Sequence, residues 1–128
     1  MAEKQDLWCN GIPCAMYGRA KMALCREKFG DHEGAIKVAE GMMRDYAQFT
    51  YAPGVHSEQR DNMEAAKGVA YLASKNLGDE ERATYWLGLM EKNSQGQPVI
   101  LVAWQAVRKA VEKRRAEDPV YDALMTGQ

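Results

Sequence analysis

The chain has 128 residues, of which 46% are hydrophobic and 27% charged, the composition of an ordinary folded protein rather than a disordered one. Seventeen basic and eighteen acidic side chains give a net charge of -1, which excludes a strong overall attraction to nucleic acid or anionic membranes. No apolar run approaches the roughly 20 residues of a membrane span and no signal peptide is evident, so we expect a cytoplasmic protein.

The first half of the chain predicts a polar lead-in over residues 1–12 and then a helical hairpin over residues 13–50. Pro13 suits the first position of a helix, and Met16, Ala20, Ala23 and Leu24 recur at helical spacing up to residue 28. A second helix follows Asp31 and ends before Pro53. Its apolar face is broad, so we expect it to contact more than one neighbouring helix.

The second half predicts another hairpin over residues 57–93 and a further helix over residues 98–118. Ser57 is a plausible cap for a helix that ends at Leu77, and the next helix runs from Asp79 to about residue 92. Residues 93–97 have the composition of a linker, and residues 119–128 form a tail, which either adds one short turn or frays. No stretch shows the apolar alternation of a strand, so the predicted class is all-α within a single domain over residues 1–128.

A short motif occurs at the centre of each predicted hairpin. Phe29-Gly30-Asp31 and Leu77-Gly78-Asp79 are 48 residues apart, and an alanine follows each aspartate by four positions. Glycine readily adopts the left-handed conformation that ends a helix, and aspartate accepts hydrogen bonds from the free N–H groups of the next helix. The motif therefore predicts two similar helix–turn–helix units.

This repeated Gly-Asp-x-x-x-Ala element resembles the tetratricopeptide repeat, in which it joins the two helices of each hairpin. The resemblance covers roughly residues 16–49 and 64–92 and implies antiparallel hairpins stacked as a short array, with the helix over residues 98–118 as a C-terminal cap. The spacing exceeds the 34 residues of that repeat, and two hairpins are fewer than the three that such stacks usually need. The alternative is a five-helix bundle that uses a Gly-Asp turn twice.

The resemblance implies that the first helix of each hairpin lines a groove that binds an extended peptide or a partner helix. The ligand-facing positions of the family fall on Tyr17, Ala20, Leu24, Glu27, Lys28, Ala65, Gly68, Leu72, Lys75 and Asn76. The protein-binding residues that we predict among them are Tyr17, Leu24, Lys28, Leu72, Lys75 and Asn76. The alternative for the apolar members of this set is that they are ordinary core residues.

No pattern in the sequence indicates catalysis, a metal site or a cofactor. The three cysteines are an odd number, and Cys9 and Cys14 have no second pair at a spacing typical of zinc sites. No serine or cysteine nucleophile is matched to a histidine in a known motif, and no glycine-rich phosphate loop is present. We therefore expect no enzyme activity, no metal and no cofactor.

A basic cluster near the C-terminus supports a second hypothesis, an accessory nucleic-acid-associated subunit. The cluster consists of Arg108, Lys109, Lys113, Arg114 and Arg115, with Glu112, Glu117 and Asp118 nearby. The preferred hypothesis is a protein-binding adaptor, chaperone-like or inhibitory module that recognises a protein segment. Self-association through the helix over residues 98–118 or through the lead-in over residues 1–12 is a further expectation, whereas no membrane partner is expected.

Overall fold

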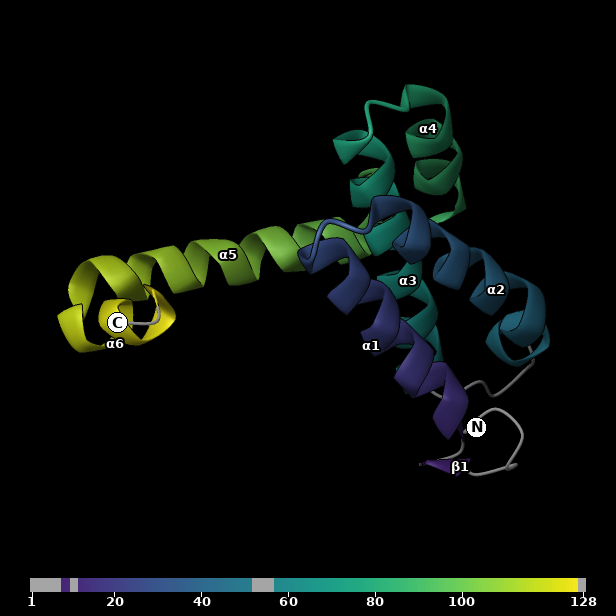
Figure 1. The fold of residues 1–128 in the computed structure, drawn as a ribbon, viewed down its shortest axis with the longest axis horizontal. Coiled ribbons are helices and arrows are strands. Elements are labelled where there is room, and N and C mark those ends of the chain that lie inside the picture. Colours follow the sequence, from purple (N-terminus) through teal and green to yellow (C-terminus); the bar gives the residue numbers. More distant parts are fainter. Residues whose placement is uncertain (1–7, 10–11, 52–56, 127–128) are drawn as a thin grey trace. The chain divides into compact units, whose positions relative to one another are not determined.

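The computed structural model describes residues 8–9, 12–51 and 57–126, and the side chains of residues 15–46 and 61–126. Two short strands precede six helices (Figure 1), which are β1 Trp8–Cys9, β2 Ile12–Pro13, α1 Cys14–Lys28, α2 His32–Tyr51, α3 Ser57–Asn76, α4 Glu80–Leu89, α5 Val99–Glu117 and α6 Pro119–Thr126. Consecutive helices pack in pairs, which confirms the predicted class of an all-α array of helical hairpins. The chain forms two compact units, residues 1–91 and residues 92–128.

The helices α1, α2, α3 and α5 begin and end within two residues of the predicted bounds, but α4 is shorter than predicted. Its last residue is Leu89, and Met90 has the extended backbone angles φ -73° and ψ 145°. The next N–H group, that of Glu91, donates a hydrogen bond of 2.7 Å to the Glu64 carboxylate on α3. A contact with α3 thus provides the hydrogen-bond acceptor for this N–H group, which a carbonyl of α4 would have provided if the helix had continued.

The structure adds one short strand pair at the N-terminal end, which was not predicted from the sequence. β1 and β2 pair in antiparallel register, with Trp8 opposite Pro13 and Cys9 opposite Ile12. The two residues between these strands in the sequence are Asn-Gly, the pair that most favours a two-residue hairpin turn. The signal for the strand pair was therefore present, although each strand is too short to show alternation.

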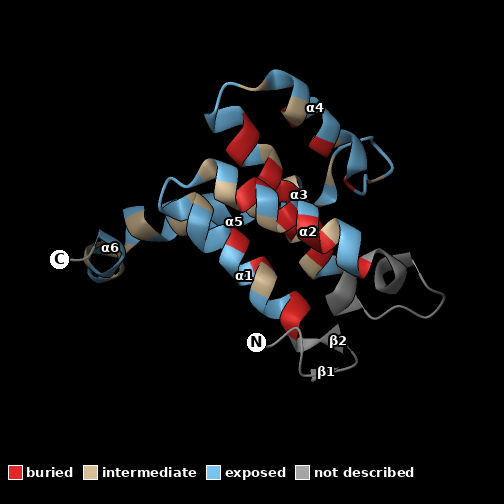
Figure 2. Cartoon of the chain, turned by 45° about the vertical axis from the view of Figure 1, so that its right-hand side comes forward, coloured by how far each residue is buried: buried red, intermediate tan, exposed pale blue. Residues whose placement is uncertain are grey.

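The core of the first unit lies between α1, α2, α3 and α4. α3 packs against the other three helices of this unit, and α1 also packs against α2. Figure 2 shows that the buried positions of these helices face one another. Most of the buried apolar residues are alanines and methionines, joined by Ile36, Val69 and Trp86. Small alanine side chains allow helix axes to approach closely, and methionine fills the irregular gaps that remain.

The second unit consists of α5 and α6, and neither helix contains a buried residue. Residues 119–126 form a helix instead of the single turn or frayed end that the sequence suggested. Asp118 accepts hydrogen bonds from the N–H groups of Val120 and Tyr121, and Arg115 pairs with Asp122 at 2.6 Å. Asp118-Pro119 is a good helix start, because aspartate caps free N–H groups and proline suits the first helical position.

The predicted linker over residues 93–97 is an ordered turn. The Asn93 side-chain oxygen accepts hydrogen bonds from the N–H groups of Gln95 and Gln97, at 2.9 and 3.0 Å. Gly96 has a φ of 76°, and its N–H group donates to the Asn93 carbonyl. None of the helices that the structure describes is long and apolar enough to cross a membrane.

Candidate protein-interaction surface

The two Gly-Asp turns have the same backbone hydrogen bonds. Gly30 and Gly78 have φ angles of 84° and 74°, in the left-handed region that glycine adopts without strain. Each glycine N–H donates to the carbonyl three residues earlier, and the N–H of each following aspartate, Asp31 or Asp79, donates to the carbonyl five residues earlier. This pair of bonds defines the Schellman motif, so the predicted turn conformation is confirmed at both places.

Each aspartate also caps the helix that follows its turn, as predicted. Asp31 accepts a hydrogen bond of 3.0 Å from the Gly34 N–H, and Asp79 accepts one of the same length from the Arg82 N–H. Hydrogen bonds to the charged carboxylate lower the pKa of both groups, chiefly from the Arg26 side chain at Asp31 and from the Arg82 backbone at Asp79. Both caps therefore stay ionised at neutral pH.

Side chains join the first turn to the second. Glu27 on α1 accepts a hydrogen bond of 2.6 Å from Asn76 at the end of α3, and its other oxygen lies 2.7 Å from His32. Arg82 on α4 forms a bidentate ion pair with Glu33 on α2, with N–O distances of 2.6 and 3.0 Å. These five residues, Glu27, His32, Glu33, Asn76 and Arg82, form what we call the turn cluster. The cluster holds the two turns side by side.

The contacts of α1 determine which of its faces is exposed. Arg19 bonds to Asp45 on α2, whereas Glu27 bonds to Asn76 on α3. Successive helical residues are rotated by about 100° around the helix axis. Tyr17, Leu24 and Lys28 therefore lie next to the side of α1 that faces α3, and far from the side that faces α2. The predicted residues of α1 therefore lie beside the line along which α1 and α3 pack against each other, which we call the α1–α3 seam.

The predicted residues of α3 lie on the other side of the same seam. Glu64 bonds to the segment after α4, and Asn76 bonds to α1, so these two residues mark the sides of α3 that face its neighbours. Leu72 and Lys75 fall between these two sides on the helix. We call the six predicted residues Tyr17, Leu24, Lys28, Leu72, Lys75 and Asn76 the α1–α3 face.

All six residues of the α1–α3 face are exposed. The exposed fractions of its three apolar side chains are 42% for Tyr17, 44% for Leu24 and 37% for Leu72. The interpretation of these three as plain core residues is therefore wrong. Two further positions that the family resemblance placed on the groove, Ala20 and Gly68, are buried and cannot contact a ligand.

The distribution of apolar side chains by size is unusual in the first unit. No leucine with a described side chain is buried there, because Leu24, Leu72, Leu77 and Leu89 are exposed and Leu87 is half-buried. The interior is filled mainly with alanine and methionine instead. Exposed apolar side chains that form a contiguous patch, unlike scattered ones, are typical of surfaces that bind another molecule.

The polar residues of the α1–α3 face differ in their surroundings. Lys75 pairs with Glu80 at 3.1 Å, and this hydrogen bond raises the pKa of the Lys75 ammonium. Asn76 donates to Glu27 and so belongs to the turn cluster as well. Lys28 is exposed and forms no ion pair with any residue that the structure describes. Lys28 is therefore the polar member of the face that is available to a partner.

Lys21 was not among the predicted residues, although it lies on the same side of α1 as Tyr17, Leu24 and Lys28. It is exposed and, like Lys28, forms no ion pair within the described part of the chain. The signal was its spacing, because Lys21 lies four residues after Tyr17 and seven before Lys28. Residues four or seven apart share one side of a helix.

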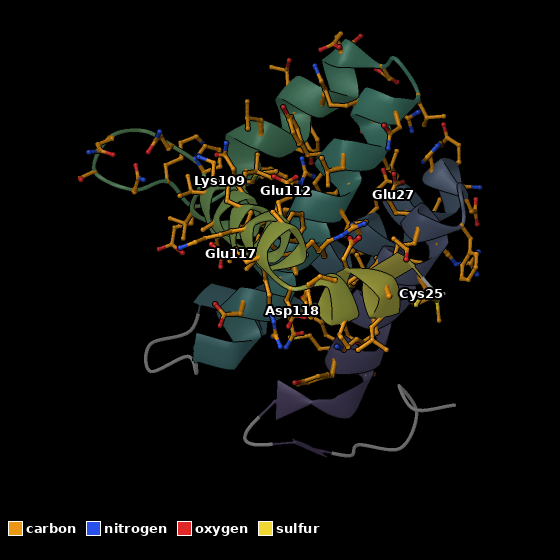
Figure 3. All side chains as sticks on the ribbon, turned by 90° about the vertical axis from the view of Figure 1, so that its left-hand side faces the viewer. Cys25, Glu27, Lys109, Glu112, Glu117 and Asp118 are labelled. Atoms are coloured by element: carbon orange, nitrogen blue, oxygen red, sulfur yellow. The ribbon has the colours of Figure 1, made fainter. Side chains whose placement is uncertain are left out.

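The predicted nucleic-acid-binding residues all lie in the C-terminal half of α5, where two of the five have contacts with α6. Arg115 pairs with Asp122, and the Arg114 guanidinium lies 4.1 Å from the centre of the Tyr121 ring. Arg108, Lys109 and Lys113 are exposed. Glu112 and Glu117 lie in the same half of α5 as Lys109 (all three are labelled in Figure 3), so acidic residues are interspersed with the basic ones.

The residues that the structure describes contain no group of three or more histidine, cysteine, aspartate or glutamate side chains that could hold a metal ion. Cys25 is an exposed free cysteine on α1, whereas the side chains of Cys9, Cys14 and Trp8 lie outside the described part. Comparison of the chain with protein-family models, with curated proteins and with solved structures found no match.

Proposed function

We propose that this protein is a cytoplasmic protein-binding module, an adaptor or inhibitory subunit that binds a segment of another protein on the α1–α3 face. The observation that carries this proposal is the exposure of Tyr17, Leu24 and Leu72 on adjacent helices whose buried positions hold mainly small residues. Tyrosine is enriched at the centres of protein interfaces, where neighbouring exposed apolar side chains exclude water.

The polar surroundings of these three residues also support binding of a protein. Lys28, Lys75 and Asn76 lie toward the C-terminal ends of α1 and α3, so polar groups border the apolar residues at this end of the face. A polar rim around an apolar centre is the usual anatomy of a protein interface. The resemblance to the tetratricopeptide repeat also assigns ligand binding to α1 and α3.

Site-specific photo-crosslinking in cells tests the proposal. A photo-crosslinking amino acid in place of Tyr17 is expected to give discrete protein adducts, because this position lies on the proposed interface. The same amino acid in place of Tyr85 on α4 is the matched control, since Tyr85 is also an exposed tyrosine of the first unit. We expect far fewer adducts from position 85.

Adding Leu72→Glu and Lys75→Glu to the crosslinking variant should remove the adducts, because both changes place negative charge on the α1–α3 face. Both residues are exposed, so the helical circular dichroism spectrum should not change. Adducts that persist at position 17 in this triple variant, with the fold intact, would show that the protein binds its partner elsewhere.

A further inference from the structure

The C-terminal end of α4 lacks the local signals that end the other helices of the first unit. α1 and α3 are each followed by a glycine with a positive φ, Gly30 or Gly78, whereas Gly88 lies inside α4 and has no positive φ. Residues 90–92, which follow α4, are methionine, glutamate and lysine, and all three are good helix formers. Local preference would therefore continue α4 beyond Leu89.

A buried carboxylate on α3 competes with that local preference. The Glu91 N–H donates a hydrogen bond of 2.7 Å to the Glu64 side chain. Met90, just before it, has the extended backbone angle ψ 145° and an exposed fraction of only 4%. In a continued helix the Glu91 N–H would donate instead to the Leu87 carbonyl, four residues earlier. This N–H group therefore has two alternative acceptors, one within α4 and one on α3.

Lys67 holds the Glu64 carboxylate in position. Its ammonium donates a hydrogen bond of 2.6 Å to Oε2 of Glu64, while Oε1 accepts the Glu91 N–H. The exposed fractions of the two side chains are 4% for Lys67 and 12% for Glu64. Apolar residues of similar volume often stabilise a core as well as such an ion pair does. Some buried ion pairs contribute conformational specificity rather than stability.

We propose that the Glu64–Lys67 pair is a conformational device that selects where α4 ends. While the carboxylate accepts the Glu91 N–H, Met90 stays extended and the chain leaves the first unit at Glu91. When that acceptor is removed, α4 continues through Glu91, because the Leu87 carbonyl is the acceptor that remains. The selection takes place within the first unit and is independent of any partner on the α1–α3 face.

Two double variants that differ only at position 64 test this proposal on the full-length protein. Glu64→Met/Lys67→Met removes both charges and the acceptor. Glu64→Gln/Lys67→Met also removes both charges but keeps an oxygen that can accept the Glu91 N–H. The Cα chemical shifts of Met90 and Glu91, measured by NMR, distinguish helical from non-helical backbone. We expect helical shifts only in Glu64→Met/Lys67→Met, with the wild type and the glutamine variant alike.

The matched control is Lys109→Met/Glu112→Met, which replaces the same two residue types at the same spacing on the exposed surface of α5. The shifts of Met90 and Glu91 should not change in this variant. Far-UV circular dichroism and a cooperative urea transition establish that each variant folds.

A single variant keeps the test open if the methionine variant does not fold. Glu64→Asp retains the charge that pairs with Lys67 but shortens the side chain by one methylene group. The Glu91 amide should then exchange with deuterium about 10-fold faster than in the wild type, because its hydrogen bond to a charged group is lost.

Three results would overturn the proposal. Non-helical shifts at Met90 and Glu91 in a folded Glu64→Met/Lys67→Met variant would show that the packing of Met90 is sufficient to end α4. Helical shifts in the glutamine variant would show that the charges, and not the acceptor, determine the end of the helix. Unchanged exchange of the Glu91 amide in Glu64→Asp would show that the carboxylate does not control this segment.

Discussion

Lys67 on α3 is the most deeply buried charged residue that the structure describes, with an exposed fraction of 3%. Its ammonium donates a hydrogen bond of 2.6 Å to Glu64 one turn earlier, and the other Glu64 oxygen accepts the Glu91 N–H. Glu64 thus balances a buried charge and also ends α4. Charges are removed from water at a large cost, so such a pair is sensitive to the loss of either member.

We expect Lys67→Met to lower the free energy of unfolding by about 3 kcal/mol, because the Glu64 carboxylate would remain buried without its cation. Urea denaturation followed by circular dichroism measures this change. The double variant Glu64→Gln/Lys67→Met should recover most of the loss, since a neutral amide can still accept the Glu91 N–H. Equal stability of the single and double variants would contradict this account of the pair.

The elements differ in the support that they receive from their surroundings. α3 is buried against three other helices, whereas α5, with 19 residues, has no buried position. Most of the stability of a helix in a protein comes from tertiary packing, and α5 gains only the contacts that α6 and the turn over residues 93–97 supply within its own unit. The role of α5 as a cap on the array, which the sequence suggested, stays a prediction.

Hydrogen–deuterium exchange on the full-length protein should show slow exchange for the amides of α3 and fast exchange for those of α5. The physical reason is that opening α5 exposes little apolar surface that was buried. Mass spectrometry of peptic peptides from the two helices measures the difference. Protection of α5 as strong as that of α3 would show instead that α5 is covered in solution.

At the scale of the molecule, the Arg82–Glu33 ion pair and the Asn76–Glu27 hydrogen bond of the turn cluster hold one hairpin on the other. The Arg82 side chain lowers the pKa of Glu33, and both capping carboxylates also have lowered pKa values. These groups stay ionised in the folded protein at pH values where the unfolded chain already binds protons. Their stabilising contribution is therefore complete above about pH 5 and is lost as the pH falls through their lowered pKa values.

We expect the free energy of unfolding of the wild type to fall between pH 5 and pH 2, and to fall less steeply in Arg82→Gln. The glutamine removes the main cause of the lowered Glu33 pKa, so fewer protons distinguish the folded from the unfolded chain. Urea denaturation across this pH range measures both slopes. Lys109→Gln on α5 is the matched control, and equal slopes in Arg82→Gln and the wild type would count against the cluster.

The sequence by itself determined the helices and the turns, because these features depend on local physics. Periodic apolar residues and the two Gly-Asp pairs set most helix bounds, and the left-handed glycines and capping aspartates were predicted from residue type alone. Pro13, predicted to be the first residue of a helix, lies in β2 directly before α1. The strand pair on either side of Asn-Gly and the cap at Asp118 also had local signals in the sequence. They were not predicted because these elements are too short to show a periodic pattern.

Only the tertiary structure decided which apolar residues form the core and which remain on the surface. Periodicity places Ala20 and Leu24 on the same side of α1, yet packing buries the alanine and leaves the leucine exposed. The bonds of Glu27 to Asn76 and of Arg82 to Glu33 join residues 49 positions apart, and no local preference specifies such pairs. The candidate surface was predicted by family resemblance, but its exposure follows from how the two hairpins pack.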